Sequence, residues 1–164
     1  MNYMGINKCD LANGPGVRVS LFVSGCELRC PFCQNKEAWE TNAGHLFGEN
    51  ELASIIEFLK PDYISGFSLL GGDPLHPKNI KEATNICKKI KETYPNKTIW
   101  LWTGYNFENK RELEIWNYVD VCCDGPFIND LRDITLKYVG SSNQRIINVR
   151  KTILSRNIEI YEEL

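Results

Sequence analysis

The feature that most restricts how this chain can fold is an alternation of short apolar runs with helical patterns. Four runs have the composition of β-strands, at residues 17–23, 63–70, 98–102 and 119–123. One-face apolar spacing predicts helices between them, at residues 50–59 with Asn50 as N-cap, at 79–94, and more weakly at 109–118. Strands that alternate with helices favour parallel pairing through right-handed crossovers. We therefore expect an α/β fold.

Each predicted strand is followed by a polar or glycine-bearing motif. In chain order these motifs are the cysteine loop at residues 24–35, Gly71-Gly72-Asp73-Pro74, Thr103-Gly104-Tyr105 and Asp124-Gly125. The carboxyl ends of parallel strands lie on one rim of the sheet, where ligands bind in such folds. We therefore expect the four motifs to converge on a shared site.

The loop after the first predicted strand holds three cysteines at C-x3-C-x2-C spacing: Cys26, Cys30 and Cys33. An iron–sulfur cube normally takes four thiolates, so three cysteines leave one iron free to bind a substrate or cofactor. Gly25 would allow the sharp turn that a loop around a cluster needs. A zinc site and a purely structural thiol cluster are alternatives, although neither His45 nor His76 lies at zinc-finger spacing from these cysteines.

Composition restricts the cellular setting and the partners. A chain of 164 residues with 43% hydrophobic content is expected to form a single domain over residues 1–164. Seven cysteines and the lack of a signal-like start predict a reduced, cytoplasmic protein. The net charge of −2 and apolar runs far shorter than the ~18–20 residues of a membrane span predict neither a nucleic-acid nor a membrane partner.

Other conspicuous residues have ordinary structural interpretations. Cys87, Cys122 and Cys123 lie in apolar patterns and are expected to be small core residues. Trp100 and Trp102 should share one strand face, because side chains alternate along a strand. Residues 1–12 show no periodicity and residues 148–164 mix helical with strand-like spacing, so neither segment is assigned.

The motifs resemble those of a known superfamily. Cys26, Cys30 and Cys33, with Phe32 directly before the last, resemble the cysteine loop of the radical S-adenosylmethionine enzymes, and Gly71-Gly72-Asp73-Pro74 is similar to their glycine-rich acidic motif. Within that superfamily the chain most closely resembles the small activating proteins of the anaerobic ribonucleoside-triphosphate reductase. Further matching segments are Met1-Asn2-Tyr3, Asn13-Gly14-Pro15-Gly16-x-Arg18, residues 21–26, Leu75-His76-Pro77, residues 99–105 and Gly140-Ser141-Ser142-Asn143-Gln144.

The resemblance implies a fold and a reaction. The fold is an open, partial β/α barrel of parallel strands, of radical S-adenosylmethionine type. A [4Fe-4S] cluster on the three cysteines binds S-adenosylmethionine at its open iron, and one electron from a flavodoxin or ferredoxin cleaves it to methionine and a 5′-deoxyadenosyl radical. That radical takes a hydrogen atom from a glycine of the large reductase subunit, which keeps a glycyl radical.

The resemblance also implies roles for individual residues beside the three cysteine ligands. Phe32 is expected to shield the cluster or pack by the adenine, and Gln34 to lie near the cofactor. The remaining expected contacts are Gly71, Gly72 and Asp73 with the methionine end, and Thr103, Asp124 and Asn143 with the ribose or the partner's glycine loop.

Two alternatives stay open. The order Phe32-Cys33-Gln34 matches the wider superfamily rather than the Gly-Cys-aromatic order of reductase activators, so the partner could be another glycyl-radical enzyme. The chain could instead be a non-catalytic metal-binding module in which Cys9 or a partner's residue supplies a fourth ligand. The glycine and acidic motifs at the later strand ends favour an enzyme, because a simple zinc module does not need them.

Overall fold

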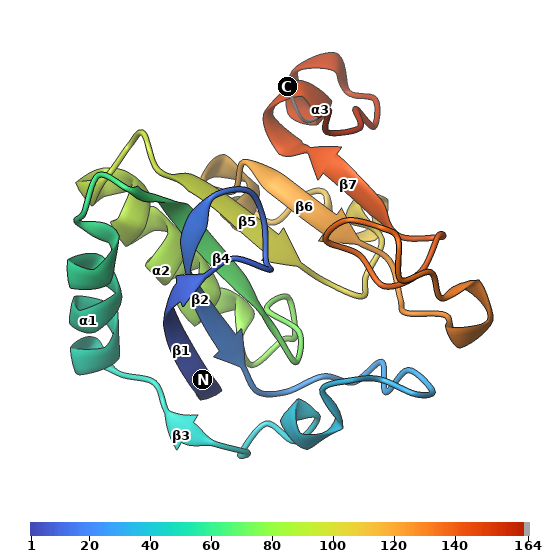
Figure 1. The fold of residues 1–164 in the computed structure, drawn as a ribbon, viewed down its shortest axis with the longest axis horizontal. Helices are drawn as coiled ribbons and strands as arrows, with labels where there is room; N and C mark the ends of the chain where they lie inside the picture. Colours follow the sequence, from blue (N-terminus) through green and yellow to red (C-terminus); the bar gives the residue numbers. More distant parts are fainter. Residues whose placement is uncertain (163–164) are drawn as a thin grey trace.

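The computed structural model describes residues 1–162, which form an open seven-stranded sheet in the order β3-β1-β2-β4-β5-β6-β7 (Figure 1). Its centre consists of parallel neighbours: β2 (Val17–Val23), β4 (Ile64–Gly71), β5 (Thr98–Trp102) and β6 (Val121–Asp124). Antiparallel strands flank this centre: β1 (Asn2–Asp10) and β3 (His45–Leu46) on one side and β7 (Arg145–Asn148) on the other. The four predicted strands and their parallel pairing are confirmed.

The whole sheet is mixed, because antiparallel strands from segments that show no clear pattern in the sequence flank the parallel centre. Residues 1–12 show no apolar periodicity because most side chains of β1 are half-buried or exposed. In β7 only Ile147 is buried. Both strands pair by main-chain hydrogen bonds that leave little trace in side-chain hydrophobicity. The structure thus shows an open α/β sheet that ends at β3 and β7.

Two helices, α1 (Glu49–Leu59) and α2 (Ile80–Thr93), confirm the first two helix predictions to within two residues. Both pack on the same face of the sheet (Figure 1). Buried side chains of that core include Ile55, Leu59, Ile86 and Ile90 from the helices and Leu21, Leu69 and Leu101 from the strands. The predicted N-cap Asn50 is wrong: the cap is Gly48, whose N–H donates to the Glu51 carboxylate at 2.9 Å.

The helix predicted at residues 109–118 is replaced by two short 3₁₀ turns, η2 (Phe107–Lys110) and η3 (Glu114–Asn117). The backbone is extended at Leu113, which separates the two turns. The Trp116 ring packs 4.8 Å from the Phe107 ring, and its Nε1–H donates to the Lys110 carbonyl at 2.7 Å. A compact aromatic contact therefore takes the place of a regular helix.

The rest of the described chain adds three short elements outside the sheet. It contains the 3₁₀ turns η1 (Lys36–Ala38) and η4 (Asn129–Leu131) and the helix α3 (Val149–Ser155). After α3 the chain turns back, and Ile160 forms a bridge with Ile147 of β7. Of the unassigned residues 148–164, only 163 and 164 lie outside the described residues. No helix within residues 1–162 is long and apolar enough to cross a bilayer.

The sheet face opposite α1 and α2 carries aromatic side chains. Trp100 and Trp102 share this face, as predicted, with ring centroids 5.7 Å apart. Tyr138 and Tyr161 pack edge-on against Trp100 and cover it. Cys123 lies in the same cluster, whereas Cys87 and Cys122 lie in the helix-side core. The three buried thiols are therefore core residues, as expected.

Arg18 is fully buried on this aromatic face and ties three strands together. Its Nε–H donates to Ser68 Oγ at 2.7 Å, and Nη2 donates to the carbonyls of Phe67 and Thr98 at 2.7 and 3.0 Å. Nη1 donates to Pro15 O and Thr98 Oγ1, and the guanidinium lies 5.7 Å from the Trp100 ring centroid. Burial lowers the pKa of Arg18 to about 10, so the residue stays charged at neutral pH.

Replacing Arg18 with lysine is expected to lower the free energy of unfolding by about 2 kcal/mol or more, because an ammonium cannot reproduce the planar fork of five donors. Urea unfolding followed by circular dichroism measures this change. The exposed Arg132 is the control, and Arg132→Lys should change stability by less than about 0.5 kcal/mol. Equal stabilities of the two variants would contradict the structural role of Arg18.

Candidate metal and cofactor site

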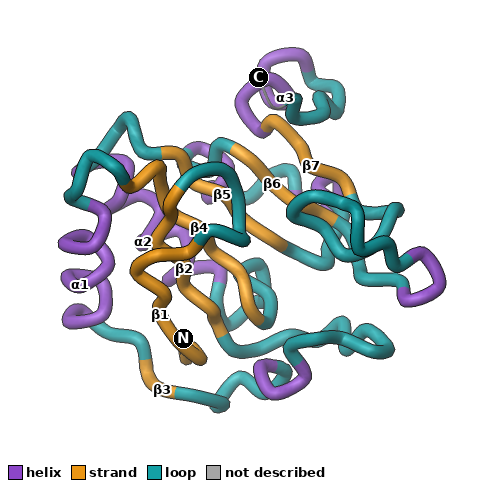
Figure 2. Tube along the Cα trace, viewed as in Figure 1, coloured by secondary structure: helices purple, strands orange, loops and turns teal. Residues whose placement is uncertain are grey.

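The four strand-end motifs meet beyond the carboxyl ends of the parallel strands. Figure 2 shows loop segments gathered at this end of the sheet, where residues from every motif line a cavity of about 170 Å³. Among the motif residues in its wall are Cys26, Cys30, Cys33, Gly71, Gly72, Asp73, Thr103, Gly104 and Gly125. The predicted convergence is confirmed.

The cysteine loop presents three free, half-buried thiols to this cavity. Gly25 and Cys26 anchor its first turn, because their N–H groups donate to the carbonyls of Ala38 and Trp39 at 2.7 and 2.9 Å. Arg29 and Phe32 precede the second and third cysteines and have left-handed φ angles of 45° and 61°. The backbone thus turns sharply before each of these cysteines, and all three line the same space.

Gly71 and Gly72 bring the end of β4 directly against the base of the cysteine loop. Gly71 has a φ of 114°, and a Cβ there would lie 2.6 Å from the main chain of Val23. A Cβ on Gly72 would lie 2.7 Å from the Gly25 carbonyl oxygen and 2.9 Å from that of Ala38. Only glycine allows this approach, so the two motifs form one structural unit.

Asp73 joins the ends of β4 and β5. Its side chain is 1% exposed, and its carboxylate accepts from the N–H groups of Leu75 and Gly104 at 2.9 Å each and from the Thr103 hydroxyl at 2.9 and 3.0 Å. Burial raises the pKa of Asp73 to about 6, although these hydrogen bonds oppose the rise. Because the carboxylate oxygens already have protein donors, Asp73 holds the site in shape.

This raised pKa predicts a pH dependence of stability in protein prepared without iron and sulfide. Between about pH 4 and pH 6 the folded state keeps a proton on Asp73 that the unfolded state releases, so stability falls as pH rises through this window. Asp73→Asn should remove this pH dependence of the stability, because an amide does not titrate. The variant also replaces one acceptor oxygen of the carboxylate with a donor group. Urea unfolding at several pH values should show wild type losing stability relative to the variant from pH 4 to 6; a constant difference would contradict the raised pKa.

Asp124 is fully buried at the end of β6 and already has partners. Its carboxylate accepts from the Phe107 N–H at 2.8 Å and from the Arg145 guanidinium at 2.5 and 3.0 Å. Asn143 Nδ2 donates to the Pro126 carbonyl at 2.8 Å. Both residues lie beside the cavity, outside its wall.

Phe32 and Gln34 also lie outside the cavity wall, on the exposed side of the cysteine loop, where Phe32 is 68% exposed. Their contacts with a cofactor stay predictions. Residues of the wall that the sequence analysis did not assign to the site are Leu28, Asn35, Leu70, Trp102, Cys123, Phe127 and Gln144. Asn35 Nδ2 donates to the Gly71 carbonyl at 3.2 Å and so links the loop to β4. The only sequence feature that indicates its place in the site is its position two residues after Cys33.

Comparisons with known proteins identify the relatives of this chain. Residues 12–147 match the family model described as a 4Fe-4S single cluster domain. The chain is 45% identical to the anaerobic ribonucleoside-triphosphate reductase-activating protein of Enterobacteria phage T4 over 146 residues, which are 89% of this chain and 93% of that protein. The chain belongs to the family of anaerobic ribonucleoside-triphosphate reductase-activating proteins. It is also 41% identical to the Escherichia coli K12 member over 92% of this chain and 100% of that protein, and 40% identical to the Vibrio cholerae member over 89% and 97%.

In this family member the three free thiols in one cavity wall are the type of donor that an iron–sulfur cube takes. Within residues 1–162, no three His, Cys, Asp or Glu side chains are grouped as ligands of one ion would be. In an iron–sulfur cube each thiolate binds a different iron, so the ligands line a wall instead of meeting at a point. His45, His76 and Cys9 all lie outside the cavity wall, so the structure gives no support to a zinc site or to Cys9 as a fourth ligand.

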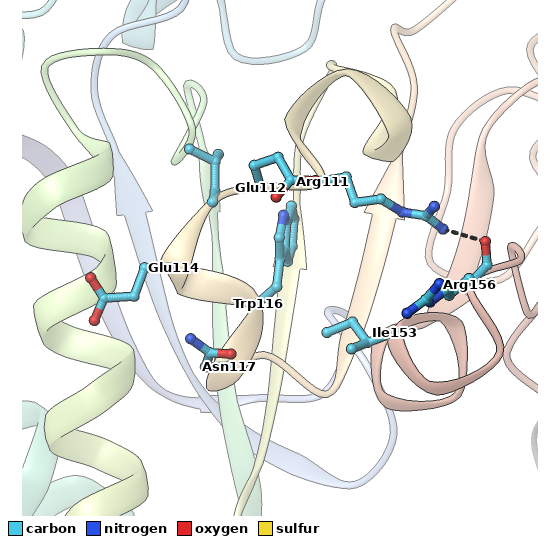
Figure 3. A pocket seen from close by; sticks show the side chains of 8 residues that line it. Arg111, Glu112, Glu114, Trp116, Asn117, Ile153 and Arg156 are labelled. Carbon is cyan, nitrogen blue, oxygen red and sulfur yellow. Dashed lines mark hydrogen bonds between the residues drawn. The ribbon is translucent and has the colours of Figure 1, made fainter.

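A larger hollow of about 430 Å³ lies between η3 and α3, away from the cysteine loop (Figure 3). Its wall includes Trp116, Ile153 and Arg111, whose guanidinium donates to the Arg156 carbonyl at 2.9 Å. No strand-end motif contributes to it. We therefore place the candidate site of this activating-protein family member in the smaller cavity.

Proposed function

We propose that this chain activates an anaerobic ribonucleoside-triphosphate reductase by reductive cleavage of S-adenosylmethionine at a [4Fe-4S] cluster. The observation that carries the proposal is the single cavity shared by three free thiols and the glycine and acidic motifs of the neighbouring strand ends. The relatives named above are activating proteins of that reductase, which favours this partner over other glycyl-radical enzymes.

Cys26, Cys30 and Cys33 would hold the cluster. When bound, the cluster and S-adenosylmethionine supply one-electron cleavage of a carbon–sulfur bond, which leads to a glycyl radical on the large reductase subunit. A reductant of the flavodoxin or ferredoxin type is the proposed electron source. Partial burial raises the pKa of the Cys26 thiol, so ligation of iron by its thiolate releases a proton.

The protein's own part is to bind, orient and exclude water. Gly71 and Gly72 would let the methionine end approach the main chain beside the cysteines. Asp73 would act on it through Thr103 and Gly104, whose positions it fixes. Apolar side chains of the wall would keep water from the reacting atoms; they are Leu28, Leu70, Trp102 and Phe127. We propose Phe32 and Gln34 as contacts at the rim of the same site.

The partial-barrel arrangement of radical S-adenosylmethionine enzymes is part of this proposal. Four parallel strands with their functional motifs on one rim support it. The antiparallel strands β1 and β7 would then extend the sheet at its two sides.

The test is activation of the reductase itself. The reconstituted protein is incubated anaerobically with the large reductase subunit, S-adenosylmethionine and a reductant, and electron paramagnetic resonance is recorded. We expect a glycyl radical signal that depends on every component. A large subunit that stays without a radical, while a known activating protein produces one, would contradict the proposed function.

A further inference from the structure

A second, polar pocket adjoins the cavity at Gly125. It measures about 330 Å³ and is lined by Asn106, Glu108, Asn109, Asn143 and Arg145; we call it the asparagine pocket. Gly125 lies in the wall of the cavity, and a Cβ built on it would lie 3.8 Å from both Asn106 Oδ1 and Asn143 Nδ2. A molecule bound in the asparagine pocket would therefore reach the edge of the cavity.

The three amides of this pocket have unused hydrogen-bonding capacity. The side chains of Asn106 and Asn109 are on exposed residues and make no hydrogen bond to any other group in residues 1–162. Asn143 Oδ1 is buried and has no donor among the same residues. A buried acceptor without a partner costs free energy, but a ligand reaches Asn143 Oδ1 only if the amide turns and gives up its bond to the Pro126 carbonyl at 2.8 Å. The exposed amides of Asn106 and Asn109 are therefore the ones open to a ligand.

The charged groups of the pocket are paired with each other. Arg145 donates to both oxygens of Glu108 at 2.9 and 2.7 Å and to both oxygens of Asp124 at 3.0 and 2.5 Å. The guanidinium is therefore occupied, which makes the pocket a poor site for an anion. A neutral ligand rich in hydrogen-bond donors and acceptors fits it better.

We propose that the asparagine pocket binds main-chain amides of the partner segment that carries the reacting glycine. A side-chain amide offers a donor and an acceptor in one plane and so complements a peptide group. Glycine has no side chain to recognise, so a segment around it can be held only through its main chain or its neighbours. This inference rests on the proposed function and assigns the hydrogen bonds to the partner to Asn106 and Asn109, in the pocket that Asn143 also lines.

The double variant Asn106→Ala, Asn109→Ala tests the proposal, because these two amides have no role in the protein's own hydrogen bonds. Isothermal titration with the large reductase subunit measures the dissociation constant. We expect it to rise about tenfold, as the loss of two hydrogen bonds implies. Formation of 5′-deoxyadenosine without the partner should stay at the wild-type level. Asn117→Ala, in the hollow of Figure 3, is the matched control and should leave both quantities unchanged.

A blocked peptide, N-acetyl-pentaglycine amide, separates main-chain recognition from other contacts. It should weaken the wild-type complex by competition and have no effect on the residual binding of the double variant. An unchanged dissociation constant in the double variant, or a wild-type chain that does not bind the large subunit, would overturn the proposal. A double variant that loses 5′-deoxyadenosine formation by the same factor as its affinity for the large subunit would also overturn it. A wild-type protein that forms no 5′-deoxyadenosine would contradict the proposed function and not this inference, because the dissociation constants are measured independently of that reaction.

Discussion

Cys30→Ala is expected to abolish iron–sulfur binding and leave the fold intact. Cys30 lies on an exposed loop. Its main-chain carbonyl accepts a hydrogen bond from the Cys33 N–H at 3.1 Å, and alanine at this position keeps that carbonyl. With one thiolate of three removed, a cube cannot be held, so iron after anaerobic reconstitution should fall from about four atoms per chain to well below one. Iron and sulfide analysis with visible absorbance measures this loss.

The control for this variant is Cys9→Ala. Cys9 is exposed on β1 and lies outside the cavity wall, so its variant should bind iron as wild type does. Circular dichroism should be the same for all three proteins. A Cys30→Ala protein that keeps wild-type iron and sulfide would show that these three cysteines are not the ligand set.

Gly72→Val is expected to disrupt the cysteine loop as well as the approach of a cofactor. The resemblance implies only that this glycine contacts the methionine end of the cofactor. In the structure the missing Cβ faces the carbonyl oxygens of Gly25 and Ala38 at 2.7 and 2.9 Å, and these are main-chain atoms that cannot rotate away. Overpacking of this kind costs about 1–3 kcal/mol, and here the loop that carries the thiols must move.

We therefore expect Gly72→Val to bind less than half of the wild-type iron and to unfold at lower urea concentration. Gly5→Ala is a matched control, because a Cβ on Gly5 would meet nothing within 4 Å. Iron analysis and urea unfolding of both variants measure the effect. Wild-type iron content in Gly72→Val would show that the loop does not need this close contact.

The sequence predicts the centre of the fold well because burial on both faces leaves a strong signal. Strands such as residues 98–102 are nearly continuous in apolar residues, and their helices carry clear apolar stripes. The outer strands β1 and β7 are held by main-chain pairing with few buried side chains, so hydrophobicity does not reveal them. Residues 109–118 mislead because Trp116 packs on Phe107 from a 3₁₀ turn.

The convergence of the site is equally predictable, because parallel strands place their carboxyl ends on one rim. The roles within it are less so. The resemblance implies that Asp73 contacts the methionine end of the cofactor. In the structure its carboxylate oxygens accept hydrogen bonds from Leu75, Thr103 and Gly104. The place of Asn35 and Gln144 in the wall depends on how the loops fold, which local spacing does not encode.

The most direct test of the central claim is formation of 5′-deoxyadenosine from S-adenosylmethionine by the reconstituted, reduced protein without any partner, quantified by liquid chromatography. If the three thiols and the strand ends form one site, wild type and Cys9→Ala should produce it and Cys30→Ala should not. Iron-loaded wild-type protein that produces none, or a Cys30→Ala protein that produces as much as wild type, would contradict the account.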